Sequence, residues 1–187
     1  MASARGRTIF LNLAIFVTIV CSSMTWEAEG GACNSRPRRL SFYLQQENGV
    51  NELRMVAPAR PPVPGTFTGF GQEQVYEFVM TQTEDPASPV MGYVRGTAVV
   101  VNNTATRTVF AINNVVHLDF MGLRGTLSQQ GEAAFTDPSW EYAIVGGTGA
   151  FRMATGYNVG RPVSLTRTPS GTVHIVTHYD AFFSLRC

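Results

Sequence analysis

Lysine is absent from the sequence, and charged residues of every kind are scarce. Of the 187 residues only 14% are charged, and all 14 basic residues are arginine; soluble proteins average about 25% charged residues. Without lysine the chain cannot form a Schiff base or use a P-loop lysine. A formal net charge of +1 gives no electrostatic footprint for nucleic acid. With 44% hydrophobic residues, the chain is long enough for one folded domain with its own core.

The common catalytic and metal-binding motifs are also missing. The sequence has no GxSxG, HExxH or CxxC motif, and the spacing of its cysteines and histidines supports no metal site. The glycine-rich run at 146–149 is not followed by the GK[ST] of a phosphate loop. We interpret this run as a tight hairpin whose glycines have positive φ angles.

The amino terminus has the pattern of a secretory signal peptide. Two arginines precede an apolar run at 9–20, and small residues follow it. The run is too short for a membrane-spanning helix, which needs about 20 residues. We therefore expect a signal peptide at about 1–28, cleaved between 23 and 32, and a secreted, extracellular domain at 33–187 without a membrane span.

Secretion changes the interpretation of the three cysteines. Cys21 lies at the end of the apolar run and would leave with the signal peptide. Cys33 and Cys187 then remain, and an oxidising compartment predicts a disulfide between them. The sequon at Asn102 is a candidate N-glycosylation site in a secreted protein.

The mature chain has the pattern of an all-β protein. Short runs rich in Val, Phe, Tyr and Thr are separated by Gly, Pro and Asn, and no long segment has the helical period. Their even spacing predicts an antiparallel barrel or sandwich. An Asn-Gly turn at 48–49 separates the first two runs. The expected strands are 40–46, 51–57, 74–82, 93–101, 107–120, 125–129, 140–145, 151–159, 163–168 and 172–185.

Polar side chains share one face of the last expected strand. His174, His178 and Asp180 alternate with apolar residues, and His117 and Asp119 do the same in the run at 107–120. These residues form either a solvated outer face or a polar patch lining a cavity. The alternation alone leaves both interpretations open.

One segment resembles a known family. Residues 143–157 read AIVGGTGAFRMATGY, similar to the late VVGGTGxFxMAxG signature of plant dirigent proteins. Three further stretches agree in order: FYL at 42–44, RGT at 95–97 and GTLSQQG at 125–131. The resemblance implies an eight-stranded antiparallel up-and-down β-barrel with a central pocket, similar to lipocalins and allene oxide cyclases. It also implies a disulfide between the ends of the mature chain and a homotrimer secreted to the apoplast and cell wall.

The resemblance also implies a class of chemistry. Dirigent proteins hold phenoxy radicals, such as those of coniferyl alcohol, and direct the stereochemistry of their coupling in lignan and phenylpropanoid biosynthesis. A separate laccase or peroxidase makes the radicals, and no cofactor is needed. Some relatives instead cyclise or dehydrate quinone-methide intermediates. A third reading is a non-catalytic module that binds a phenolic in the cell wall or in defence.

The family's pocket acids are only partly kept. Gln45-Gln46 stands where the family has His-Asp, and Ala150 replaces an acid. Glu77 and Glu141 are retained, so they are the catalytic candidates; Glu77 is expected to face the pocket because Val75 and Val79 flank it on one face, whereas Glu141 fits a solvated rim equally well. The candidate substrate-binding residues are Gln46, Phe78, Ala98, Thr155, Val176 and His178.

Overall fold

The computed structural model describes residues 37–64, 68–167, 169 and 171–185. The predicted signal peptide and both cysteines of the predicted disulfide, Cys33 and Cys187, lie outside these residues. The described residues contain no helix long and apolar enough to cross a membrane.

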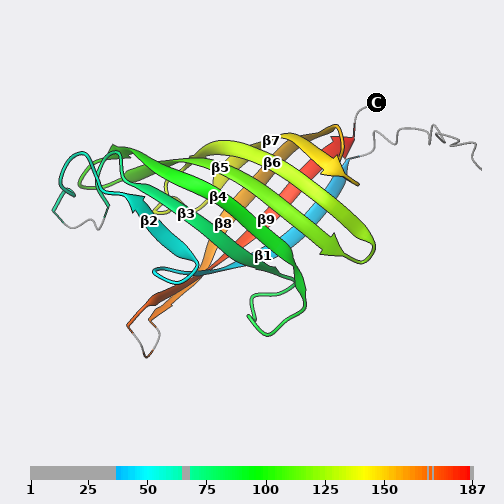
Figure 1. Cartoon of the computed structure of the whole chain (residues 1–187), viewed down its shortest axis with the longest axis horizontal. Coiled ribbons are helices and arrows are strands. Elements are labelled where there is room, and N and C mark those ends of the chain that lie inside the picture. Colours follow the sequence, from blue (N-terminus) through cyan, green and yellow to red (C-terminus); the bar gives the residue numbers. More distant parts are fainter. Residues whose placement is uncertain (1–36, 65–67, 168, 170, 186–187) are drawn as a thin grey trace, which may run out of the picture. The chain divides into compact units, whose positions relative to one another are not determined.

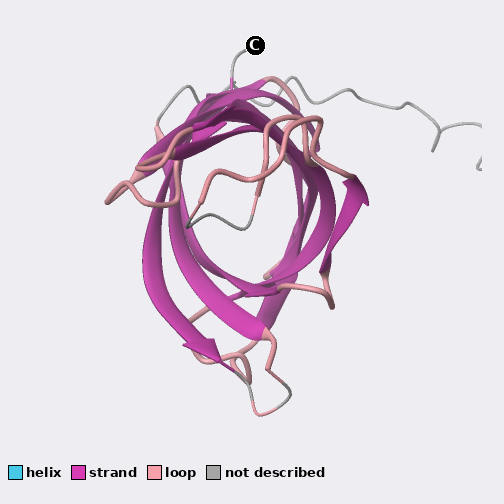
Figure 2. Ribbon diagram, turned by 90° about the vertical axis from the view of Figure 1, so that its left-hand side faces the viewer, coloured by secondary structure: helices cyan, strands magenta, loops and turns pink. Residues whose placement is uncertain are grey.

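The described chain forms a closed antiparallel barrel (Figure 1). The strands follow one another round the sheet in the order β1-β9-β8-β7-β6-β5-β4-β3-β2, and β1 also pairs with β3. This last pairing closes a ring of eight strands, seen end-on in Figure 2, and confirms the expected fold class. The strands are β1 (Arg38–Glu47), β2 (Glu52–Val56), β3 (Glu73–Thr81), β4 (Val90–Asn103), β5 (Thr108–Phe120), β6 (Leu123–Ala133), β7 (Trp140–Gly149), β8 (Ala154–Arg167) and β9 (Val173–Leu185).

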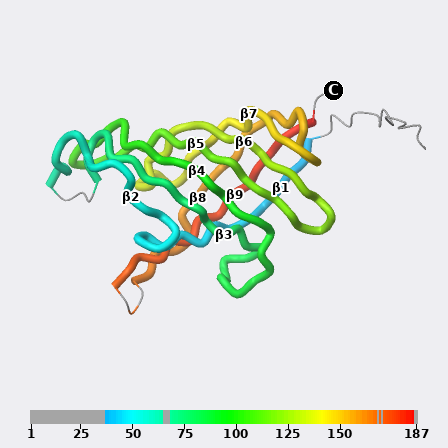
Figure 3. The backbone as a smooth tube through the Cα atoms, viewed as in Figure 1, coloured from blue at the N-terminus to red at the C-terminus, as the bar shows by residue number. Residues whose placement is uncertain are grey.

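Strands β1 and β2 do not pair with each other as a hairpin. Both lie on the same edge of β3, so the chain turns at 48–51 and then continues in the same direction (Figure 3). Gly49 takes the positive φ of +81° that the sequence predicts. Asn51 closes the turn, because its amide accepts a hydrogen bond from the Glu47 N–H at 2.7 Å and donates one to the Gln45 carbonyl at 3.0 Å.

Strand β8 is one long strand, although the sequence predicts two runs. The ladder with β9 continues past Pro162 through a register shift between Pro162 and Ser164. A proline cannot donate to the ladder, and a bulge accommodates it without ending the strand. The end of the β8–β9 hairpin consequently projects beyond the rest of the barrel (Figure 1).

The glycine-rich run at 146–149 belongs to a hairpin, as expected, but the turn comes after it. Residues 146–149 end β7, and the turn falls at 150–153. Of the three glycines only Gly149, at φ +59°, has the expected positive angle, and the other positive angle of the turn belongs to Met153 at +63°. Gly147 is needed for space: a Cβ there would lie 2.4 Å from the Phe151 carbonyl oxygen.

The core fills the inside of the barrel with alternate residues of each strand. On β9, Tyr179, Ala181 and Phe183 are buried in this core. His178 and Asp180 alternate with them and face outward. The last strand therefore presents His178 and Asp180 on the outer face, but that face is not fully solvated there, since Asp180 is buried.

Candidate functional site

The barrel contains two neighbouring cavities. The mouth cavity, of about 360 Å³, lies where the projecting β8–β9 hairpin meets β1, β2 and β7. The inner cavity leaves only about 30 Å³ open to a water-sized sphere. Gln46, Glu52 and Phe135 line both cavities, so the two cavities adjoin at these side chains.

Aromatic side chains form one wall of the mouth cavity. The Phe135 ring lies 5.2 Å from Phe110 and 4.9 Å from Trp140, in an edge-on arrangement with the latter. The Trp140 indole N–H donates a hydrogen bond to the Tyr179 hydroxyl at 3.1 Å, which fixes the orientation of the ring. On the hairpin side the wall is aliphatic, with Val163, Leu165 and Ile175.

The inner cavity is narrow because stacked rings fill the barrel. Tyr76 and Phe78 stack at 4.4 Å, and Tyr142 and Tyr179 at 6.2 Å. The Tyr76 hydroxyl donates to the Asn114 side-chain oxygen at 2.5 Å. Burial raises the pKa of Tyr76, Tyr142 and Tyr179 above the ordinary value, so all three are neutral phenols able to donate hydrogen bonds.

Three of the predicted substrate-binding residues lie together at these cavities. Phe78 and Ala98 line the inner cavity, and Gln46 lines both. The Gln46 amide donates a hydrogen bond to the Thr177 hydroxyl at 2.7 Å. Alternation along each strand places them, because each occupies an inward position of β3, β4 or β1.

The two predicted catalytic acids lie elsewhere, on the outer face. Glu77 forms an ion pair with Arg95, and about half of its side chain is exposed. The inward positions beside it belong to Tyr76 and Phe78, which are both buried. Glu141 is exposed between two buried residues of β7. The expectation that Glu77 faces the pocket is therefore corrected, and Glu141 follows the alternative of a solvated position.

The other three predicted binding residues also face away from the interior. Thr155 pairs with Ser184, and its inward neighbour Ala154 belongs to the core. Val176 and His178 alternate with residues that line the mouth cavity or the core, so they project from the outer face of β9. The expected pocket position is thus corrected for all three.

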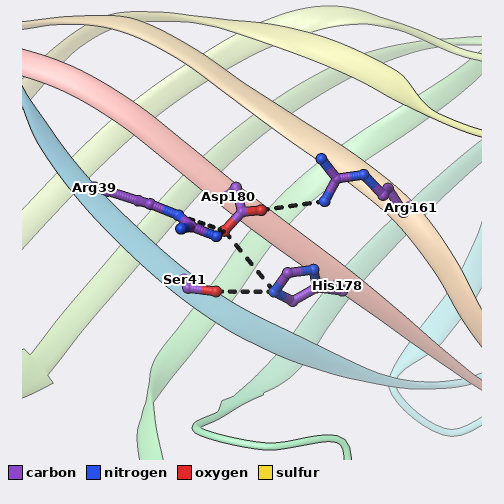
Figure 4. Close-up of polar contacts among 5 residues, drawn as sticks. All are labelled: Arg39, Ser41, Arg161, His178 and Asp180. Atoms are coloured by element: carbon purple, nitrogen blue, oxygen red, sulfur yellow. Dashed lines mark hydrogen bonds and ion pairs between the residues drawn. The ribbon is translucent and has the colours of Figure 1, made fainter.

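A polar network surrounds His178 on that outer face (Figure 4). Arg39 donates to one Asp180 oxygen at 2.8 and 3.0 Å, and Arg161 donates to the other at 3.1 Å. The Ser41 hydroxyl and His178 Nε2 are hydrogen-bonded at 2.8 Å, and Asp180 lies 3.9 Å from that same nitrogen. A catalytic triad needs the acid and the hydroxyl on different ring nitrogens, so these residues do not form one.

Glu52 is the residue that the sequence reasoning missed. It lies at the start of β2 and lines both cavities. Burial raises the pKa of its carboxyl group, and a hydrogen bond with the Asn48 side chain partly offsets this. Its apolar neighbours suggested the opposite orientation: Leu53 and Met55 would be expected to face inward and Glu52 outward. Instead the side chains of Leu53 and Met55 are 49% and 66% exposed. Elsewhere among the described residues, no three His, Cys, Asp or Glu side chains gather to hold a metal ion.

The family of the chain follows from its match to known proteins. The family model of dirigent-like proteins matches residues 38–182, from the first residue of β1 to a point three residues before the end of β9. The chain belongs to the dirigent family. This confirms the resemblance seen in the sequence.

Individual dirigent proteins are similar in sequence and in fold. Dirigent protein 23 of Arabidopsis thaliana is 32% identical over 123 residues, which span 65% of this chain and 65% of that protein. The solved pterocarpan synthase dirigent proteins GePTS1 and PsPTS1 have TM-scores of 0.65 and 0.67 at 21% identity. The matches cover 81% of this chain and 86% and 97% of theirs. At that identity the likeness establishes the shared dirigent fold.

Proposed function

We propose that this dirigent protein binds a phenolic at the mouth cavity and directs the stereochemistry of its further reaction. The preferred reaction is the coupling of phenoxy radicals, such as those of coniferyl alcohol, in lignan or other phenylpropanoid biosynthesis. A separate laccase or peroxidase would supply the radicals. The observation that carries the proposal is the mouth cavity itself, with aromatic walls and a few polar groups at its inner end.

The cavity suits the task in size and in chemistry. About 360 Å³ falls in the range of small-molecule sites, roughly 300–1,000 Å³. Edge-on and stacked contacts with Phe135 and Trp140 would hold an aromatic ring in a defined plane. Gln46 and Thr177 would hydrogen-bond its oxygen substituents. A radical fixed in this way exposes one face to its partner, so orientation alone gives stereochemical control.

The cellular setting of the proposal rests on sequence features and on family membership. The predicted signal peptide supports secretion to the apoplast, where oxidases act on phenolics. Asn102 is exposed on β4, which is compatible with a glycan there. A homotrimer remains part of the proposal through the family resemblance.

Laccase-driven coupling of coniferyl alcohol, with and without the protein, tests the proposal. We expect one enantiomer of a coupled product to predominate only when the protein is present, as measured by chiral chromatography. Racemic products in both arms would contradict radical coupling. If the phenolic still binds in that case, the protein is a binding module or acts on another intermediate.

A second candidate function is the conversion of a quinone methide. Such a reaction needs a proton donor for the substrate oxygen. Glu52 favours this candidate, because its carboxyl group lies where the two cavities meet.

A further inference from the structure

We propose that Glu52 is the catalytic acid of this dirigent protein, donating its proton to the ring oxygen of a quinone methide bound in the mouth cavity. The inference rests on the proposed phenolic site and names the residue and substrate class that the site would use. Nothing in the sequence pattern pointed to this residue, and the two acids that the pattern did favour lie on the outer face.

The lining of the two cavities singles out Glu52. Among the described residues that line them, Glu52 carries the sole carboxyl group. The other polar groups are amides, hydroxyls, phenols and the Trp140 indole, and no arginine or histidine of the described chain lines either cavity. At moderately acidic pH, Glu52 is therefore the one group in this lining that can give up a proton readily.

The surroundings of Glu52 favour its protonated form. The titratable groups facing the same space are Tyr76 on β3, Tyr142 on β7 and Tyr179 on β9, and all three are neutral. Burial raises the pKa of the Glu52 carboxyl, and the Asn48 hydrogen bond lowers it by a smaller amount. Because no cationic side chain of the described residues lines these cavities, the acid form persists to higher pH than in water.

The backbone holds Glu52 at a fixed place in the mouth. It pairs with Tyr76 across the β2–β3 ladder, and its carbonyl accepts the Gly49 N–H at 2.9 Å. The preceding Asn51 is hydrogen-bonded to β1 through its side chain. Its carbonyl also accepts the Glu77 N–H at 3.0 Å, so Asn51 is held to β3 as well. The carboxyl group is thus presented from a braced turn rather than from a free loop.

The proposed step is an addition without any change in oxidation state. A hydroxyl of the substrate, or water, forms a C–O bond at the exocyclic carbon of the quinone methide. The electron pair of the exocyclic double bond moves into the ring, and the ring oxygen takes the proton of Glu52 to become a phenol. The attacking hydroxyl releases its proton to solvent, from which the Glu52 carboxylate is protonated again.

The test separates binding from catalysis. Binding of coniferyl alcohol is followed by the fluorescence of Trp140, which lines the mouth. Catalysis is followed as the hydration of a para-quinone methide with a substituted exocyclic carbon, reading both rate and enantiomeric excess. The variants are Glu52→Gln, Glu52→Asp and, as matched control, Glu132→Gln, an exposed glutamate on the outer face of β6.

We expect Glu52→Gln to bind coniferyl alcohol within about threefold of wild type but to lose about 100-fold or more in the protein-dependent rate. The wild-type rate should be flat at low pH and fall as pH rises through the pKa of Glu52, whereas the Gln variant should lack this dependence. Glu52→Asp, which keeps an acid, should retain the pH profile at a reduced rate, and Glu132→Gln should match wild type.

Two results would overturn different parts of the argument. An unchanged rate and pH profile in Glu52→Gln would remove the role of Glu52 and leave the phenolic site intact. Failure of the wild-type protein to bind coniferyl alcohol would instead overturn the proposed function. If Glu52→Gln does not fold, by near-ultraviolet circular dichroism, the pH profile of Glu52→Asp decides: its absence contradicts the proposal.

Discussion

At the scale of single residues, Asp180 shows how an acid can be buried on the outside of a barrel. Its side chain is 4% exposed, yet it faces away from the core. Burial alone would raise the pKa of Asp180, but hydrogen bonds from Arg39, Arg161 and Ser41 lower it below the ordinary value of 3.8. The Asp180 carboxylate therefore stabilises the folded protein at every pH at which it is ionised.

This arrangement predicts a component of acid sensitivity. Because the folded pKa of Asp180 is depressed, its contribution is present above the unfolded value and is lost as pH falls below about 4. Asp180→Asn should lower the free energy of unfolding at pH 7 by about 1–2 kcal/mol, since the two arginines are half-exposed and regain water. Urea unfolding at pH 7 and pH 3 measures both values. The difference between variant and wild type should shrink at pH 3, and an equal difference at both pH values would contradict the assignment.

The same scale explains why some site residues could be predicted from the sequence and others could not. Phe78 was a candidate binding residue, and it occupies an inward position that lines the inner cavity. Glu77 was not, because Val75 and Val79 beside it suggest an apolar interior but lie on the outer face. A chain with few charges leaves apolar residues outside, while Gln74 and Asn114 occupy buried positions. Alternation gives the two faces of a strand, but polarity does not tell which face is inside this barrel.

At the scale of elements, the β7–β8 hairpin depends on one close approach. A Cβ on Gly147 would lie 2.4 Å from the Phe151 carbonyl oxygen and 2.6 Å from that of Thr126, both backbone atoms that cannot move independently. Gly146, its neighbour, has no atom within 4 Å of the same position. The two glycines therefore have different roles within one motif.

Alanine substitutions should separate these two glycines. Gly147→Ala should lower the free energy of unfolding by about 2–3 kcal/mol, the range of overpacking that the backbone must absorb. Gly146→Ala is the matched control and should change it by less than about 0.5 kcal/mol. Thermal unfolding of both variants is the measurement. Equal melting temperatures would show that the backbone near Gly147 can accept a Cβ without loss of stability.

The projecting β8–β9 hairpin is the second element with a consequence for function. Leu165 is 67% exposed and lines the mouth cavity, so its side chain is available to a ligand. Leu165→Ser should weaken the binding of coniferyl alcohol about three- to tenfold through lost apolar contact. Melting should be almost unaffected, because little of the side chain is buried. Val145→Ser, on the exposed outer face of β7, is the control.

At the scale of the whole molecule, the barrel is closed by its shortest seam. Strands β1 and β3 pair only through Tyr43–Gln45 and Val79–Thr81 in the described chain. Strands β4 and β5 pair along nearly their full lengths. Local opening is easiest where the fewest hydrogen bonds must break together.

Hydrogen exchange should reveal this difference. We expect amides of β2 and of the β1–β3 seam to exchange well before those of β4, β5 and β6 under native conditions. Mass spectrometry of peptides from these strands gives the comparison directly. Uniform protection round the barrel would mean that the seam opens only when the whole domain unfolds.

The even strand spacing and the dirigent-like signature at 143–157 were sufficient to predict the barrel, because each strand and turn follows local rules. The shared use of the β3 edge by β1 and β2 was not predictable, since an Asn-Gly turn usually joins paired strands. That choice depends on which edge is free after the other strands have closed. It also determines the position of Glu52.

The turn at 48–51 holds the mouth and the closing seam of the barrel together. Strand β1 before the turn and strand β2 after it both pair with β3, and Asn51 is bonded to β1 through its amide and to β3 through its carbonyl. Glu52 comes directly after Asn51, so its side chain can be replaced without removing these bonds. Redesign of substrate preference in this protein should therefore begin at Glu52 and leave the turn residues unchanged.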